Sequence, residues 1–198
     1  MTENINILPR KINLKKYNAK EFFEFTKDKE ERYELIDGQI KLMASPSVQH
    51  QNLTFEIGRK IGNYLEDKKC RVFMVPLDVV LFERKNKDKK KKDNAQNVFQ
   101  PDIFVVCDPK KIAKNRINGA PNLIIEVVSP SNSSQDYIKK LDVYMEYGVR
   151  EYWIVNPETK QIFVNINGRK VKTYIYTFED KIKSSIFEDF EIDFKELL

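Results

Sequence analysis

Two acidic side chains set into apolar segments are the residues of this sequence best suited to chemistry. Asp102 stands in a Gln-Pro-Asp-Ile tetrapeptide, and Glu126 follows 24 residues later inside the apolar run 124–128. Runs rich in Val, Ile and Phe are typical of strands that are buried on both faces. A buried carboxylate is costly unless a cation or a hydrogen-bond network surrounds it. We therefore interpret the pair as oxygen ligands for a hard divalent metal ion.

A lysine of a predicted helix after these strands is the best candidate for a third member of the site. On a helical wheel Lys139 points to solvent, whereas Lys140 lies at the edge of the apolar face, between Tyr144 and Tyr147. A partly desolvated lysine beside acids and a phosphate can orient or help deprotonate a water and offset developing charge. The alternative is an i, i+4 ion pair with Asp136 on the helix surface, and the spacing does not separate the two.

The scarcity of histidine narrows the possible chemistry further. His50 is the one histidine, so zinc sites built from several histidines are excluded, and any Ser-His or Cys-His chemistry must use it. The sequence has no Cys-x-x-Cys pair, phosphate-binding glycine loop or Gly-x-Ser-x-Gly motif. We interpret His50 as a helix-cap or core residue rather than a catalyst. Carboxylates and lysine remain as the groups for catalysis.

Length and composition fit one globular domain of the cytoplasm. The chain has 198 residues, of which 41% are hydrophobic and 33% charged, and no apolar stretch approaches the roughly 20 residues that cross a bilayer. The N-terminus has no basic region followed by an apolar one, so we expect neither a secretory signal nor membrane association. Cys70 and Cys107 are interpreted as buried free thiols in a reducing compartment.

The positive charge of the chain is concentrated in one segment. The net charge of the chain is +5. Residues 84–97 carry seven basic and two acidic side chains, so the net charge of this segment equals that of the whole chain. A cationic loop that leads directly to Asp102 could hold phosphates near the site by a nonspecific electrostatic attraction. The alternative is a solvated hairpin tip without a role. The central residues of this candidate nucleic-acid contact are Lys89, Lys90, Lys91 and Lys92.

Sequence patterns predict an α/β or α+β fold with helices packed on a mixed sheet. A capping box at Asn18 opens the first helix, Asp-Gly turns a hairpin, and Pro76 interrupts or bends a strand-forming segment. The expected elements are a helix at 18–29, a hairpin at 33–43, a helix at 50–67, one or two strands at 72–82, strands at 103–107 and 123–128, a helix at 133–148, a strand at 151–155, a hairpin at 162–178, and a tail at 186–198 that alternates and then looks helical.

A set of short segments resembles, in order and spacing, the signature segments of one family. The resemblance is to the Uma-two family of restriction-endonuclease-like proteins, within the PD-(D/E)XK nuclease superfamily, and it runs from about residue 20 to the C-terminus. The segments are 33–38, 45–50, 100–102, 119–121, 126–131, Asp136 with Lys140, Tyr144, 148–153 and 156–157.

This resemblance implies a restriction-endonuclease-like αβββαβ core with an N-terminal helix and hairpin and a C-terminal β-hairpin extension. We expect a single domain over residues 1–198. Within it, residues 1–48 form the N-terminal helix and hairpin, 49–157 the core and 158–198 the extension.

The resemblance also implies roles for individual residues. Asp102 and Glu126 become the metal-binding acids, helped by the backbone carbonyl of Val127. The superfamily pattern puts a lysine two residues after Glu126, where this sequence has Val128, and Lys140 on the next helix matches the displaced lysine.

Two further residues receive roles from the same resemblance. Glu34 is the expected additional acid, with a surface strand position as the alternative, and Gln100 is expected to touch a metal-bound water or a phosphate.

The implied activity is hydrolysis of DNA phosphodiester bonds with Mg²⁺ or Mn²⁺ as the cofactor. DNA is the expected partner, and a homodimer is expected because it would let two sites face two strands. Two alternatives remain open. One is a nucleic-acid-binding protein whose nuclease fold no longer cuts, and the other is a homodimeric interaction module in which Asp102 and Glu126 form a buried structural network.

Overall fold

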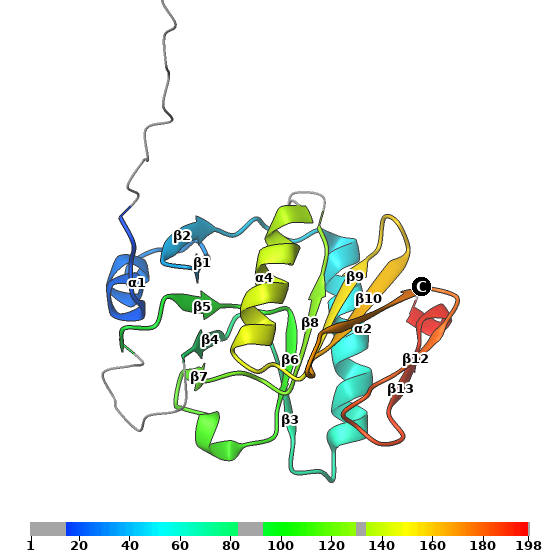
Figure 1. Ribbon diagram of the computed structural model, residues 1–198. Helices are drawn as coiled ribbons and strands as arrows, with labels where there is room; N and C mark the ends of the chain where they lie inside the picture. Colours follow the sequence, from blue (N-terminus) through cyan, green and yellow to red (C-terminus); the bar gives the residue numbers. More distant parts are fainter. Residues whose placement is uncertain (1–14, 83–92, 130–133, 198) are drawn as a thin grey trace, which may run out of the picture.

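Two large sheets, one two-stranded sheet and three α-helices make up most of the described part of the chain. The structure is a computed structural model, and it describes residues 15–82, 93–129 and 134–197. Figure 1 shows the larger sheet in the middle of the molecule, with one helix in front of it, and the smaller sheet at its side. The helices are α1 (Ala19–Thr26), α2 (Val48–Leu65) and α4 (Ser134–Glu146).

The larger sheet has six strands in the order β11-β10-β9-β8-β6-β3. Strands β8 and β9 are parallel because α4 carries the chain back between them, and the other neighbours are antiparallel. The bounds are β3 (Arg71–Met74), β6 (Ile103–Val106), β8 (Leu123–Val127), β9 (Glu151–Asn156), β10 (Gln161–Ile166) and β11 (Lys172–Thr177).

Helices α2 and α4 cover opposite faces of this sheet. Alternate residues of β6 point to opposite sides: Ile103 and Val105 join the core with α2, whereas Phe104 and Val106 join the core with α4. The central strands are therefore buried on both faces, which explains their continuous apolar sequences. The order α2, β3, β6, β8, α4, β9 confirms the predicted αβββαβ core.

The smaller sheet combines the N-terminal hairpin with strands from the middle of the chain. Its order is β2-β1-β5-β4-β7. The Asp-Gly turn has φ of 50° and 78°, as a two-residue hairpin requires, and a Cβ on Gly38 would lie 3.0 Å from that of Lys16. The bounds are β1 (Tyr33–Ile36), β2 (Gln39–Leu42), β4 (Asp78–Leu81), β5 (Asn97–Phe99) and β7 (Arg116–Asn118).

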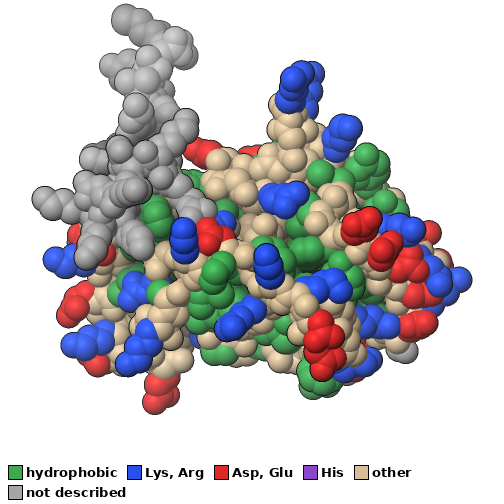
Figure 2. Space-filling model, turned by 90° about the horizontal axis from the view of Figure 1, so that it is seen from below, with side chains coloured by type: hydrophobic (Ala, Val, Ile, Leu, Met, Phe, Trp, Pro, Cys, Tyr) green, Lys and Arg blue, Asp and Glu red, His purple; other side chains and the backbone are tan. Residues whose placement is uncertain are grey.

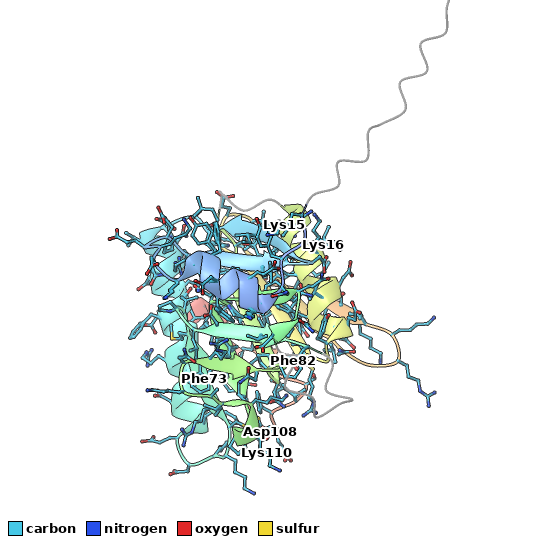
Figure 3. All side chains as sticks on the ribbon, turned by 90° about the vertical axis from the view of Figure 1, so that its left-hand side faces the viewer. Lys15, Lys16, Phe73, Phe82, Asp108 and Lys110 are labelled. Atoms are coloured by element: carbon cyan, nitrogen blue, oxygen red, sulfur yellow. A yellow bond between two sulfur atoms is a disulfide. The ribbon has the colours of Figure 1, made fainter. Side chains whose placement is uncertain are left out.

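Several predicted boundaries change in the structure. The segment predicted as one or two strands divides at Pro76, so that β3 joins the larger sheet and β4 the smaller. Strands β5 and β7 were not predicted, because three residues are too few for a recognisable alternation. Figure 3 looks at the molecule from the side of the smaller sheet, with Lys15 and Lys16 at one end of the molecule and Asp108 and Lys110 at the other.

The C-terminal region confirms the predicted hairpin β10–β11 and adds a small sheet. Strand β12 (Lys181–Lys183) pairs with β13 (Glu191–Asp193), and a short 3₁₀ helix, Phe194–Leu197, follows. Phe178, Ile192 and Phe194 belong to the core beneath α2. The extension therefore closes the face of the larger sheet that α2 covers.

The expectation of two free thiols is wrong. The structure joins Cys70 and Cys107 in a disulfide, with their Cα atoms 3.9 Å apart. Strands β3 and β6 pair Arg71 with Val106, so the two cysteines face each other one residue beyond that pair. Disulfides are uncommon in the cytosol, so the predicted cytoplasmic location loses the support of free thiols and stays a prediction.

Across the three described ranges, no helix combines the length and the apolar character that spanning a membrane would need.

Candidate active site

Strand pairing brings the two predicted acids together. Strands β6 and β8 are antiparallel with Ile103 opposite Ile125, so Asp102 and Glu126 stand opposite each other at the next position. The Asp102 backbone N–H donates to Glu126 Oε2 at 3.4 Å, and Val127 N–H donates to Asp102 Oδ2 at 2.9 Å. Only 8% of Asp102 and 4% of Glu126 is exposed. The two acids therefore form one buried unit.

Lys140 enters this unit from α4. Its Nζ lies 3.0 Å from Glu126 Oε1 and 3.0 Å from the Glu34 carboxylate. The lysine is 8% exposed, so its ammonium is directed into the protein and not onto the helix surface, contrary to the alternative of a surface ion pair. One helical turn further, the Tyr144 hydroxyl donates to the same oxygen of Glu126 at 2.9 Å.

Glu34 reaches the site from the smaller sheet. It lies in β1, is 5% exposed, and accepts a hydrogen bond on Oε1 from the Gln100 backbone N–H at 3.1 Å. The alternative of a surface strand residue does not hold. Lys140 thus bridges an acid of each sheet, which ties the N-terminal hairpin to the core.

His50 belongs to the same site. The sequence analysis interpreted it as a helix-cap or core residue and did not place it there. It stands in the first turn of α2, where the Ser47 side chain caps the helix by accepting from the His50 backbone N–H at 3.1 Å. Its ring Nε2 lies 3.1 Å from Asp102 Oδ2. The helix-cap interpretation was therefore incomplete, because the backbone of this residue serves the cap while the ring faces the acid.

The five side chains surround one pocket. Glu34, His50, Asp102, Glu126 and Lys140 all line it. The β1–β2 hairpin supplies further lining residues of two kinds, the basic Arg32 and Lys41 and the apolar Leu42 and Met43.

Burial and mutual charge set the protonation of the site. Burial raises the pKa of Glu126 to about 7; Lys140 opposes this rise, and the Asp102 and Glu34 charges add to it. Burial acts to lower the pKa of Lys140, but the Glu126 and Glu34 carboxylates outweigh it, so that the net pKa is raised. Burial also raises the pKa of Tyr144 well above its usual value. Lys140 and Tyr144 therefore remain proton donors around neutral pH.

The acids around His50 favour the charged form of its ring. Burial acts to lower its pKa, but the hydrogen bond to Asp102 and the charges of Asp102 and Glu126 outweigh burial and raise it. The ring therefore binds Asp102 as a cation over a wider pH range than a free histidine would.

The side chain of Gln100 is not brought to the pocket. The Gln100 side chain points to Asp78, with Nε2 donating to Oδ1 at 3.0 Å, and lines a different hollow beside Lys29; its predicted contact with a metal-bound water or phosphate stays a prediction. Lys89, Lys90, Lys91 and Lys92 lie outside the described residues.

The oxygen atoms of the acid pair fit a hard divalent ion. Both contacts of the Asp102 carboxylate, from His50 and Val127, go to Oδ2, and Oδ1 has no hydrogen-bond partner among the described residues. Within the same residues no group of three His, Cys, Asp or Glu side chains is placed to hold a metal ion. Asp102 and Glu126 would supply two carboxylates, a number that Mg²⁺ accepts when water and substrate oxygens complete its shell.

The mixed sheet with α2 and α4 on opposite faces is a restriction-endonuclease-like nuclease fold. A family model described as "Putative restriction endonuclease" (Uma2) matches residues 19–195, and the chain belongs to this family.

Similarity to known proteins extends over most of this chain. The chain is 25% identical over 148 residues to the uncharacterised protein slr1290 of Synechocystis, covering 74% of this chain and 72% of that protein. It is 25% identical over 141 residues to sll1609 of the same organism, covering 70% and 73%. The crystal structure of a putative nuclease of the DUF820 group from Anabaena variabilis superposes with a TM-score of 0.72 and 19% identity, covering 91% of this chain and 96% of that one.

Proposed function

We propose that this protein is a metal-dependent endonuclease that hydrolyses phosphodiester bonds of DNA. The observation that carries the proposal is the meeting of Asp102, Glu126 and Lys140 in one buried pocket, with the ammonium 3.0 Å from Glu126. Membership of a family described as "Putative restriction endonuclease" supports the same reaction class.

Asp102 and Glu126 would hold the Mg²⁺ or Mn²⁺ ion. The Val127 carbonyl is a further candidate ligand, since Val127 N–H points to Asp102 and the N–H and C=O of a strand residue point to the same side. A bound ion would polarise the scissile phosphate and lower the pKa of an attacking water. The burial of both acids supports this assignment because a divalent cation would offset the cost of their desolvation.

The side chains of the protein supply the remaining steps. Lys140 keeps its proton, since its pKa is raised, and therefore donates to phosphate oxygens or to the water and offsets negative charge as it develops. This protonation favours charge stabilisation over the other role considered for lysine, deprotonation of the water. Glu34 and Tyr144 hold Lys140 and Glu126 in position through the contacts described above.

The test compares Asp102→Asn and Glu126→Gln with the wild type in a plasmid-nicking assay with Mg²⁺, Mn²⁺ or EDTA. We expect metal-dependent nicks from the wild type and at least a ~10²-fold loss in each variant, because each removes a metal-binding charge. Circular dichroism and thermal melts check that both variants fold. Undiminished cutting by both variants would refute the assignment.

Nucleic-acid binding without any nicks from the wild type, in either metal, would favour the non-cleaving alternative instead. The homodimer remains a prediction, which light scattering on the purified protein tests.

A further inference from the structure

We infer that the β1–β2 hairpin forms the wall of the pocket to which the substrate binds. We infer further that this substrate is an unpaired nucleic-acid strand. Arg32 and Lys41 would bind the phosphates on either side of the one that lies over Asp102 and Glu126. This inference rests on the proposed function and deepens it, since it names the form of the substrate and the residues that hold it.

The register of the hairpin sets both basic residues on the face that borders the pocket. Glu34 of β1 pairs directly with Lys41 of β2, and directly paired residues point to the same face. Arg32 lies two residues before Glu34 and shares that face by alternation, and its carbonyl accepts from the Met43 backbone N–H at 2.9 Å. One face of the hairpin therefore carries an acid at the bottom of the pocket and two cations around it.

Charge complementarity indicates what these cations bind. The interior of the pocket holds three carboxylates, Glu34, Asp102 and Glu126, which would repel a phosphate chain. Arg32 and Lys41 are only half-buried, at positions where they can meet the phosphates that flank the scissile one. Arginine suits this task, since its planar guanidinium binds two phosphate oxygens at once.

On the underside of the molecule, as far as its residues are described, Lys and Arg side chains lie interspersed with acidic and apolar ones (Figure 2). Such a surface attracts a polyanion less than a run of one sign does.

The depth of the acids selects an unpaired strand. Glu34, Asp102, Glu126 and Lys140 are each no more than 8% exposed, so a scissile phosphate must enter the pocket to reach them. An intact duplex is stiff over about 150 base pairs, whereas a single strand bends freely and uncovers the faces of its bases.

The rim of the pocket is suited to such bases. Leu42 lines the pocket and is 65% exposed. It offers apolar surface on which uncovered bases can lie, whereas the bases of a duplex are already stacked on one another.

The experiment measures binding apart from cleavage. Fluorescence anisotropy in EDTA follows a labelled single-stranded oligonucleotide and the same sequence as a duplex. The double variant Arg32→Gln/Lys41→Gln is compared with Lys110→Gln/Lys114→Gln, which loses the same charge; Lys110 lies at the far end of the molecule from Lys16, which packs against the hairpin turn (Figure 3).

We expect the hairpin variant to bind the single strand at least about tenfold more weakly. The slope of its affinity against salt concentration should correspond to about one to two fewer phosphate contacts. The control variant should bind like the wild type, and the wild type should prefer the single strand to the duplex by about tenfold. A rim variant, Leu42→Ser, should weaken binding without changing the salt dependence, because it removes apolar contact surface and no charge.

The possible failures are distinguishable. Equal affinity of the hairpin and control variants would overturn the role of Arg32 and Lys41, and equal affinity for duplex and single strand would overturn the unpaired substrate. Neither result affects the proposed function, which is tested by the loss of cleavage in Asp102→Asn and Glu126→Gln. Undiminished cleavage by both of those variants would refute the nuclease assignment and leave only the strand-binding role of the hairpin.

Discussion

Two buried glutamates on neighbouring parallel strands differ in the groups that surround their carboxylates. Glu126 of β8 is 4% exposed and Glu151 of β9 is 0% exposed. Among the described residues Glu151 accepts from neutral donors only: the Trp153 indole N–H at 2.6 Å on Oε1, and on Oε2 the Ser185 backbone N–H at 2.8 Å, the Ser185 hydroxyl at 2.5 Å and the Ser184 hydroxyl at 3.3 Å. Glu126 instead meets the Lys140 ammonium and lines the pocket.

The difference shows that burial of a carboxylate does not by itself mark an active site. The oxygens of Glu151 are enclosed by donors that hold the C-terminal extension against β9, so this acid serves the fold. Glu126 lies at a pocket, shares its surroundings with two other carboxylates, and has its pKa raised to about 7 by burial. Glu126 differs from Glu151 in having a charged partner, Lys140, and in lying at a pocket.

The largest effects are expected from substituting the two glutamates in parallel. Glu126→Gln should lose at least ~10²-fold in cleavage rate and keep most of its stability, since the amide oxygen still accepts from Tyr144. Glu151→Ala should lose about 3 kcal/mol of unfolding free energy, because several buried donors lose their acceptor, and keep its cleavage rate per folded molecule. Urea unfolding and plasmid nicking on both variants measure this. Loss of activity in a fully folded Glu151→Ala would contradict the division of roles.

The pH dependence of cleavage should follow Glu126. With a pKa of about 7 the carboxylate is protonated below that pH and cannot serve as a metal ligand, so the rate should fall about tenfold per unit below pH 7 and level off above it. Initial rates from pH 5.5 to 8.5 at a fixed metal concentration test this. A profile that stays flat down to pH 5.5 would show that Glu126 ionises normally.

Removal of the ammonium should move that profile. The charge of Lys140 lowers the pKa of Glu126, so Lys140→Met should shift the acid limb to higher pH and also slow the rate on the plateau. Lys139→Met is the matched control, because Lys139 is exposed on the same helix and should leave the profile unchanged. An unshifted limb in Lys140→Met would separate Lys140 from the ionisation of Glu126.

The smallest effect is expected from Tyr144→Phe. This change removes one neutral hydrogen bond to Glu126, worth about 1 kcal/mol, and leaves every charge in place. Cleavage should fall by about tenfold at most, with the acid limb shifted slightly upward, as expected for loss of an outer partner of a metal ligand. A loss as large as that of Glu126→Gln would give Tyr144 a direct role instead.

Much of the site was predictable because its residues stand out locally. Asp102 and Glu126 interrupt apolar strands, and helical periodicity separated Lys140 from Lys139. The Asn18 capping box and the Asp-Gly turn were equally visible, and the structure has both. The position of Tyr144, one turn after Lys140, was the available signal for its role, although the sequence analysis predicted no role for it.

Other contacts left no local trace. The His50 ring meets Asp102 across 52 residues of chain, and Lys140 meets Glu34 across 106. Cys70 and Cys107 bond only because β3 and β6 are neighbours in a particular register. A one-residue change in strand register would abolish such a contact without altering any local pattern.

The sequence by itself determined most of the segments that form helices and strands, and it marked Asp102 and Glu126 as charged residues that need buried partners, because periodicity and the cost of desolvation act on neighbours along the chain. The tertiary structure alone decided which of these charges share a pocket. Sheet order and register set the distances between side chains on separate strands, and those distances give Glu126 its cation and Glu151 its neutral donors.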